Sequence, residues 1–444
     1  MYKVIIYILS TIITSFYFFP FEFSFLPGAN TKMIMAGMGL VVLGIRLAKG
    51  QKMSIDKDVF ILSIYAIMIS LASLATMIYN NTNDTSFLTY FISMWVWLGG
   101  AYFVVMWLKQ THGYLSIRLV SHYLIAVCVA QCVIALSMDM YSPLKQFVDS
   151  FLGGEEAFMG KAEGRLYGIG AALDVAGFRF ASVLIIISVL CTRTKEMWLQ
   201  FLYVLAFFVI LIIGSMIGRS TAIGAGVAFV FLVGYSLLNK DQDGRASIGQ
   251  FWKLFIIAFV VGLPFIIYEY NSNPSIRENI RFAFEGFFSM YEKGYWSTNS
   301  TDILVNHMIV FPETMKTWII GDGYCANPYA DPYYTGRIFH GFYMGTDIGF
   351  IRFLFYFGII GTLAMVLYMC NVSLACVRRF PNYRILFVLL LILTMIEWFK
   401  VSTDIFLVFA LFLCISSEEQ MCAEDKLYNA NDCSLFFQEG TESS

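Results

Sequence analysis

Long apolar runs alternate with short polar connections along almost the whole chain. Twelve of these runs are about as long as a helix that crosses the hydrocarbon core of a bilayer, which takes roughly 20 residues. They lie near residues 4–19, 32–48, 59–79, 87–108, 117–138, 175–192, 198–217, 221–238, 252–269, 348–376, 385–399 and 402–416. The pattern therefore predicts an all-α polytopic membrane protein with about 12 transmembrane helices.

The composition agrees with this prediction. Hydrophobic residues make up 59% of the 444 positions and charged residues 14%, and the mean hydropathy is +0.70. A soluble protein of this size is less apolar. No small-residue cleavage site precedes the aromatic stretch 16–25, so we expect the first run to be a helix and not a removed signal peptide. We assign residues 1–416 to a transmembrane domain and residues 417–444 to an acidic cytoplasmic tail.

Basic residues in the connecting segments orient the predicted helices. If Lys3 is cytoplasmic, the inner loops and ends contain 16 of the 29 Lys and Arg residues, and the short outer loop 80–86 contains none. Lys and Arg are enriched in cytoplasmic loops. This bias predicts that both termini are cytoplasmic, and it leaves 13 basic residues on the outer side.

The sequence disfavours several classes of function. The net charge of −2 gives no indication of a nucleic-acid partner, and the chain has no Walker loop, dinucleotide glycine motif, CxxC pair or HExxH motif. Of the nine cysteines, Cys325 alone falls in a long outer loop, so we expect no disulfide framework. We expect no cofactor and no metal ion.

Two outer loops are much longer than the other connections. They cover residues 139–174 and 270–347, and loops longer than about 15 residues are usually functional. The first is rich in glycine and contains Arg165, and the second has seven aromatic residues between Tyr324 and Tyr343. We expect short interfacial helices here, packed over the membrane domain.

Four short motifs together resemble a known family. They are Ser215–Ser220, which opens a helix, the Gly-Asp-Gly-Tyr stretch Gly321–Tyr324, the stretch Thr346–Arg352, and the stretch Phe355–Gly361 that follows it. These motifs, with the twelve-helix plan and the large late outer loop, resemble the O-antigen ligase and polymerase superfamily. The Wzy-type polysaccharide polymerases are the most similar members. The resemblance covers most of the chain.

The resemblance implies a membrane fold similar to the GT-C class in the bacterial inner membrane, with the large loop between the ninth and tenth helices and the active site on the periplasmic face. It also implies a metal-independent inverting glycosyltransferase whose substrates are glycans on undecaprenyl pyrophosphate. A polymerase transfers the growing chain to the non-reducing end of a lipid-linked repeat unit, with a chain-length regulator as a candidate partner. A ligase transfers finished polymer to lipid A core. Ligases usually have a His where this chain has Asp347, which favours a polymerase of O-antigen or capsular polysaccharide.

Arginine is the residue type that suits a pyrophosphate leaving group. Negative charge grows on the pyrophosphate as the anomeric bond breaks, and the guanidinium group binds phosphate oxygens in pairs and stays charged. The candidates are Arg165, Arg179, Arg219 and Arg352. Each has a structural alternative: Arg179 and Arg352 extend to the membrane interface, Arg219 anchors a helix end, and Arg165 forms a loop ion pair with Asp174 or a nearby Glu.

Asp347 and His340 are the candidate catalytic bases. Attack by a sugar hydroxyl needs at most one weak general base, which a carboxylate or an imidazole can supply. Asp347 also stands at a predicted helix start, where a carboxylate is favoured by the helix dipole. His340 is also an ordinary loop hydrogen-bonding residue in the alternative interpretation.

Three further residues are candidates for binding the sugar or lining the cleft: Asp322, Tyr324 and Lys400. Tyr324 belongs to the aromatic cluster 324–343, which forms either a sugar-stacking surface or an interfacial anchor. Lys400 either extends a cationic cleft or forms an ion-pair staple with Glu397 and Asp404, which lie at i, i+3 and i+7 with it.

Two other classes of function remain open. A transporter of the same lipid-linked oligosaccharide would also have about 12 helices and buried arginine, but its charges are expected near the bilayer midplane. A structural member of an envelope complex would not need clustered arginine. The positions of the charges along the chain favour the enzyme over both.

Overall fold

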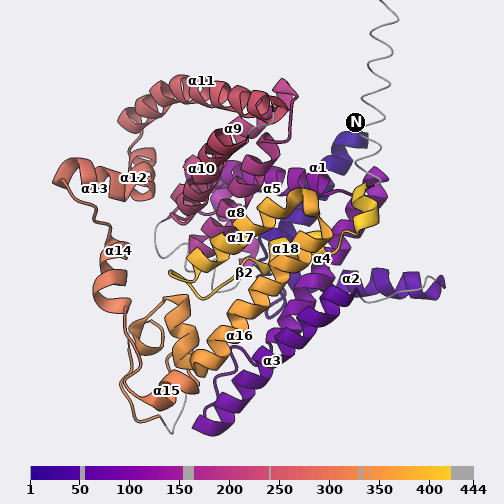
Figure 1. The fold of residues 1–444 in the computed structure, drawn as a ribbon. Helices are drawn as coiled ribbons and strands as arrows, with labels where there is room; N and C mark the ends of the chain where they lie inside the picture. The colour runs from indigo at the N-terminus through magenta and orange to yellow at the C-terminus, as the bar shows by residue number, and fades with distance from the viewer. Residues whose placement is uncertain are drawn as a thin grey trace, which may run out of the picture.

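The computed structural model describes residues 2–50, 56–153, 165–239, 242–329, 334–339 and 341–421, and these are almost entirely helical (Figure 1). Each of the 12 predicted apolar runs contains a helix. The helices are α1 (Tyr2–Phe18), α2 (Thr31–Ala48), α3 (Lys57–Asn80), α4 (Tyr90–His112), α5 (Ile117–Met140), α8 (Leu173–Cys191), α9 (Met197–Ile217), α10 (Thr221–Leu238), α11 (Gln242–Ser272), α16 (Gly349–Arg379), α17 (Arg384–Glu397) and α18 (Phe406–Leu413).

Nine helices within the described ranges are long and apolar enough to span a membrane: α2, α3, α4, α5, α8, α9, α10, α11 and α16. The chain is therefore a multi-pass membrane protein. Helices α1, α17 and α18 have only 17, 14 and 8 residues.

The predicted ranges 385–399 and 402–416 are too long for the last two helices. Polar groups in and beside the connection between them form hydrogen bonds with one another. The Trp398 indole N–H donates to the Thr403 carbonyl at 2.8 Å, and an Asp404 carboxylate oxygen accepts from the Phe406 N–H at 2.9 Å. These bonds replace helical ones, so α17 ends at Glu397 and α18 begins only at Phe406.

The connections between successive helices gather at two opposite faces of the bundle. At one face, the Cys325 N–H donates to Asp84 at 2.8 Å and the Lys400 ammonium group lies 2.6 Å from Asp174. At the other, an ion pair joins Lys109 to Glu419, and the ring of Tyr7 packs against that of His112 at 5.6 Å. Both ends of the described chain thus lie at the second face.

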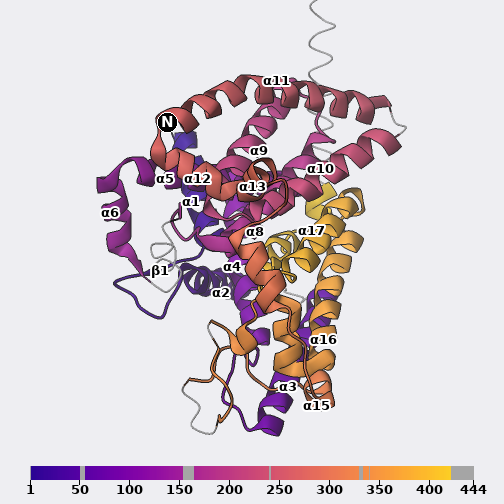
Figure 2. The same ribbon diagram turned by 90° about the vertical axis from the view of Figure 1, so that its left-hand side faces the viewer.

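The two long loops are both at the first face, which Figure 2 turns toward the viewer. The described part of residues 270–347 contains short helices, as expected, and α12 and α13 lie across α9 in Figure 2. They are α12 (Pro274–Ala283), α13 (Glu285–Lys293), α14 (Asn299–Ile303), the π-helical turn η1 (Leu304–Met308), α15 (Met315–Ile319) and the 3-10 turn η2 (Tyr343–Gly345). In the other loop, α6 (Ser142–Phe151) leads into strand β2 (Leu152–Gly153), which pairs antiparallel with β1 (Glu22–Phe23).

Cys325 is a poor probe of this face although it lies in the large loop. Its side chain is 5% exposed, and burial raises the pKa of its thiol, an effect that the Arg352 charge opposes. Thiol reagents attack the thiolate. An exposed position on the same loop is needed instead, and Tyr291 on α13 is 90% exposed.

We expect a membrane-impermeant thiol reagent to label Tyr291→Cys in intact spheroplasts when the native cysteines are replaced. Glu196→Cys is the matched control, because Glu196 is exposed in the α8–α9 connection at the opposite face. It should react only after the membrane is permeabilised. The reverse pattern of labelling would contradict the orientation predicted from the basic residues.

Helix α16 is broken in the middle. Phe357 and Gly358 leave the helical conformation, with φ of +65° and ψ of −166° at Gly358. The break frees two carbonyl groups, which accept hydrogen bonds from the large loop: Asp322 N–H to Phe355 at 2.6 Å and Gly323 N–H to Tyr356 at 3.0 Å. The Gly-Asp-Gly motif is thus inserted beside the break, which accounts for two of the motifs noted in the sequence.

We expect Gly358→Ala to lower the melting temperature of the purified protein. This backbone conformation is open essentially only to glycine and costs other residues about 1–3 kcal/mol, and a Cβ atom would lie 2.2 Å from the Ile319 carbonyl oxygen. Gly262→Ala in α11 is the control, because a Cβ there meets nothing within 4 Å. Equal melting temperatures for the two variants in detergent would rule out this account of the break.

Candidate functional site

A cavity of about 940 Å³ opens at the first face, between α12 and α13 and the ends of the membrane helices. Its size is within the usual range for ligand sites, about 300–1,000 Å³. We call it the α12–α13 cavity. It is lined by Asp139, Arg165, Arg219, Ser275, Glu278, Asn279, Arg281, Phe282, Glu285, Phe288, Ser289, Glu292, Lys293, Ser297 and Asn299. Acidic and basic side chains are equally numerous in this lining, so the cavity is not the purely cationic cleft expected from the sequence.

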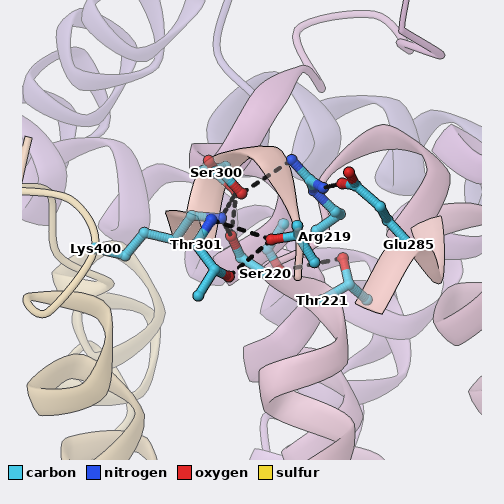
Figure 3. A network of polar contacts seen from close by, with 10 residues as sticks. Arg219, Ser220, Thr221, Glu285, Ser300, Thr301 and Lys400 are labelled. Carbon is cyan, nitrogen blue, oxygen red and sulfur yellow. Dashed lines mark hydrogen bonds and ion pairs between the residues drawn. The ribbon is translucent and has the colours of Figure 1, made fainter. Parts of the chain in front are cut away.

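Arg219 lines this cavity from the turn between α9 and α10, and Figure 3 shows its side chain between Glu285 and Ser300. One guanidinium nitrogen forms an ion pair with Glu285 and another donates to the Ser300 hydroxyl at 3.0 Å. The side chain is 16% exposed and contacts α13 and α14. These contacts differ from those of a helix end anchored in lipid headgroups.

Arg165 and Arg219 share one aromatic ring. The guanidinium carbon of Arg165 lies 4.7 Å, and that of Arg219 4.6 Å, from the centroid of the Phe282 ring. Two cations this close repel one another unless an anion lies between or beside them. Glu285 supplies that anion for Arg219, and Asp174 interacts electrostatically with Arg165.

Lys400 is joined to the same region by a short polar network. Its ammonium nitrogen lies 2.6 Å from an Asp174 oxygen and 3.3 Å from the Ser220 hydroxyl, which itself donates to Asp174. Ser220 directly follows Arg219, so this network adjoins the cavity (Figure 3). The staple predicted between Lys400 and its neighbours in sequence is wrong, because α17 ends before Lys400 and the partner comes from α8.

Glycines allow this network to form. Gly177 in α8 approaches the α9–α10 turn so closely that a Cβ atom on it would lie 2.9 Å from the Gly218 carbonyl oxygen. A Cβ on Gly218 would lie 2.4 Å from the Leu173 carbonyl oxygen. Small residues let helix backbones come together in membranes. The start of α8, with Asp174, is thereby held against Ser220.

Asp347 lies just before α16 and does not cap it. The N-cap residue is Ile348, which makes no side-chain cap bond, and Asp347 instead accepts from Arg352 at 3.4 Å. The Asp347 side chain is 34% exposed. Burial raises the pKa of Asp347 to about 6, with Arg352 opposing the shift and Asp174 adding to it. The carboxylate is therefore a stronger base than an ordinary Asp and is mostly deprotonated at neutral pH.

Four residues hold Arg352 in position. It donates to the Ser402 hydroxyl at 2.7 Å and to the Cys325 sulfur at 3.0 Å, as well as to Asp347. Its guanidinium carbon also lies 3.8 Å from the centroid of the Phe342 ring. The side chain is 11% exposed, so it is embedded in protein and does not extend to the membrane interface.

A second cavity, of about 550 Å³, lies beside the break in α16. We call it the α16-break cavity. Asp322 accepts there from Lys316 at 2.9 Å, and Tyr324 packs in an aromatic cluster with Tyr334 and Tyr343. It is lined by Asn80, Thr82, Pro312, Glu313, Thr314, Lys316, Thr317, Asp322, Tyr324, Tyr334, Thr335, Gly336, Tyr343, Met344 and Phe355.

The structure thus divides the sequence-predicted residues into groups. Arg165 and Arg219 line the α12–α13 cavity, and Lys400 is joined to it through Ser220 and Asp174. Asp347 and Arg352 line neither cavity, although Lys400 and Asp174 act electrostatically on Asp347. Asp322 and Tyr324 line the α16-break cavity. His340 lies outside the described residues, as does most of the predicted tail 417–444.

Arg179 points elsewhere. It is 7% exposed, its guanidinium carbon lies 5.8 Å from the Phe19 ring centroid, and it interacts electrostatically with Glu397. It is absent from the lining of the α12–α13 cavity. The alternative that Arg179 extends to the membrane interface is also wrong, because its side chain is buried among helices.

Sequence reasoning missed Phe282, Glu285 and Ser300, although all three contact Arg219. Their signal was weak: α12 has polar and apolar residues on opposite faces, which indicates a helix lying on a surface but not what it covers. No family model, curated protein or solved structure matches the chain.

Proposed function

We propose that this chain is a polysaccharide polymerase of the bacterial inner membrane, with 12 membrane crossings, a GT-C-like fold and its active site at the periplasmic face. The observation that carries the proposal is the convergence of Arg165 and Arg219 on the Phe282 ring, in a cavity next to the Lys400 network. Paired guanidinium groups suit a pyrophosphate. The helix found in each of the 12 apolar runs supports the count of 12.

The reaction is a single displacement at the anomeric carbon of the donor glycan. The acceptor hydroxyl oxygen forms a bond to that carbon while its proton passes to Asp347. The bond from the same carbon to the pyrophosphate oxygen breaks, and the pyrophosphate leaves with the electron pair. One displacement inverts the configuration, and undecaprenyl pyrophosphate is released.

Four basic residues have a part in this scheme: Arg165, Arg219, Lys400 and Arg352. Arg165 and Arg219 bind the pyrophosphate and stabilise its growing charge, which requires it to displace Glu285 from Arg219. Lys400 orients the turn that carries Arg219 through Ser220. Arg352 fixes the position of Asp347.

The location of the buried charges favours an enzyme over a transporter. Arg352 is in the first turn of α16, Glu397 is the last residue of α17, and Arg179 is within the first two turns of α8. All three are thus near the first face. A transporter is expected to bind its substrate near the bilayer midplane.

Analysis of lipid-linked glycans in a deletion strain tests the proposal. Without a polymerase, we expect undecaprenyl pyrophosphate carrying a single repeat unit and surface glycolipid with one repeat. Chromatography and mass spectrometry of the extracted lipids distinguish the outcomes. Long polymer stranded on the lipid would identify a ligase instead, and an unchanged lipid profile would refute both glycosyltransferase functions.

A further inference from the structure

The α16-break cavity is built from different residues than the α12–α13 cavity. Its walls come from the end of α3, the segment around α15, the inserted Gly-Asp-Gly motif and the aromatic cluster at Tyr343, and it shares no lining residue with the α12–α13 cavity. Both cavities open at the same face of the bundle. The second cavity is therefore separate from the first.

This cavity is lined by two carboxylates, those of Asp322 and Glu313, and by one ammonium group, that of Lys316. Asp322 forms an ion pair with Lys316 at 2.9 Å, and the same carboxylate oxygen accepts from the Thr317 hydroxyl at 2.8 Å. The other oxygen has only a long bond, 3.3 Å, from the Tyr343 hydroxyl. A carboxylate oxygen accepts about two hydrogen bonds, so this oxygen has capacity for a donor from a ligand. A neutral ligand with hydroxyl groups fits better than a phosphate, which the carboxylate would repel.

Aromatic rings form the other wall. Tyr324 packs edge-on against Tyr334, with ring centroids 5.3 Å apart, and against Tyr343 at 5.4 Å. Sugar rings present C–H groups on their faces, and the negative face of an aromatic ring attracts the positive edges of such groups. The same lining contains hydroxyl and amide groups of Asn80, Thr314 and Thr335. A sugar has hydroxyl groups around a ring whose faces are apolar, so it matches this combination of aromatic rings and polar groups.

We infer that the α16-break cavity is a saccharide subsite, which binds an uncharged sugar ring of the repeat unit away from the pyrophosphate. The inference rests on the proposed function for the identity of the glycan. A contact path leads from the α16-break cavity to the candidate base: Arg352 bonds to both Asp347 and Cys325, and Cys325 follows Tyr324 in the chain. The subsite selects the sugar, and the α12–α13 cavity binds the charge.

Filling the cavity from its rim tests the inference without disturbing the packed residues. Thr335 lines the cavity and is exposed, so Thr335→Trp places a large ring there. Ile338→Trp is the matched control on the same loop, because Ile338 is 40% exposed and outside the lining. The two probes are oligosaccharides released by mild acid from the producing strain's surface polysaccharide, and undecaprenyl pyrophosphate without sugar. Binding to the full-length protein in nanodiscs is measured by microscale thermophoresis.

We expect Thr335→Trp to weaken oligosaccharide binding by at least about tenfold, the equivalent of roughly 1.4 kcal/mol, and to leave undecaprenyl pyrophosphate binding unchanged. Arg219→Lys should weaken undecaprenyl pyrophosphate binding and leave oligosaccharide binding unchanged. Ile338→Trp should change neither. Absence of oligosaccharide binding to the wild type, or equal binding to Thr335→Trp, would overturn the subsite. If oligosaccharide binding depends on Thr335 but the deletion strain has an unchanged lipid profile, the subsite stands and the polymerase function fails.

Discussion

Replacing Arg219 by Lys is expected to abolish visible polymer while the protein still accumulates in the membrane. Lysine keeps the charge but loses the planar fork that binds two phosphate oxygens. Loss of one group that stabilises charge in a transition state typically costs about 10²–10³ in rate. The measurement is gel analysis of surface polysaccharide in the complemented deletion strain, with membrane levels determined by immunoblot.

Arg277→Lys is the matched control for this variant. Arg277 lies on the same loop, is exposed, and donates to the backbone carbonyls of Tyr270 and Asn271. It is outside the lining of the α12–α13 cavity, so normal polymer is expected. Normal polymer from Arg219→Lys at wild-type membrane levels would show that Arg219 does not bind the leaving group.

Glu285 separates a catalytic role of Arg219 from a structural one. If the ion pair serves only to hold α13, Glu285→Gln, which removes a charge from the pair, should damage the protein at least as much as Arg219→Lys, which keeps both charges. If Arg219 binds pyrophosphate, Glu285→Gln removes a competing anion and polymer formation continues. The two variants are therefore informative together.

The helices could be predicted because each depends on local sequence. A run of about 20 apolar residues can satisfy its backbone inside a bilayer only as a helix. The ends of the last two helices could not be predicted, since polar bonds such as that from Trp398 to Thr403 close the connection between them. Hydropathy does not register such bonds.

The break in α16 could not be predicted from hydropathy either. Phe357 is as apolar as its neighbours, and the sequence predicts a continuous helix across it. The helix breaks where carbonyl groups gain new donors from Asp322 and Gly323, which are more than 30 residues away in the chain. The motifs showed that both stretches were unusual, but not that they contact one another.

The sequence indicated which residue type to examine at the candidate site, but not which residues contact it. Arginine at the outer ends of helices is costly without a partner, which identified Arg219 and Arg352 as candidates. Their partners Glu285 and Ser402 come from distant segments, and no spacing rule connects them. Arg179 was chosen by the same rule, but its side chain turns toward α1 instead of the cavity.

Asp347→Asn is expected to lower the rate of polymerisation by about 10²–10⁴, the usual contribution of a general base. The amide keeps the size of the side chain and can still accept from Arg352, so the start of α16 should remain in place. The rate is measured with the wild type and the variant in nanodiscs, using lipid-linked repeat unit extracted from the deletion strain. Asp302→Asn, a change of the same kind in α14 outside both cavities, should keep the wild-type rate.

The pH dependence gives this prediction a second readout. A base acts in its deprotonated form, and burial raises the pKa of Asp347 to about 6, so kcat/KM of the wild type should fall as the pH is lowered through about 6. Above that pH the carboxylate is charged and the rate should level off. The residual activity of Asp347→Asn should lack this transition, because the amide does not titrate. A variant that keeps both the rate and the transition would show that another group accepts the proton.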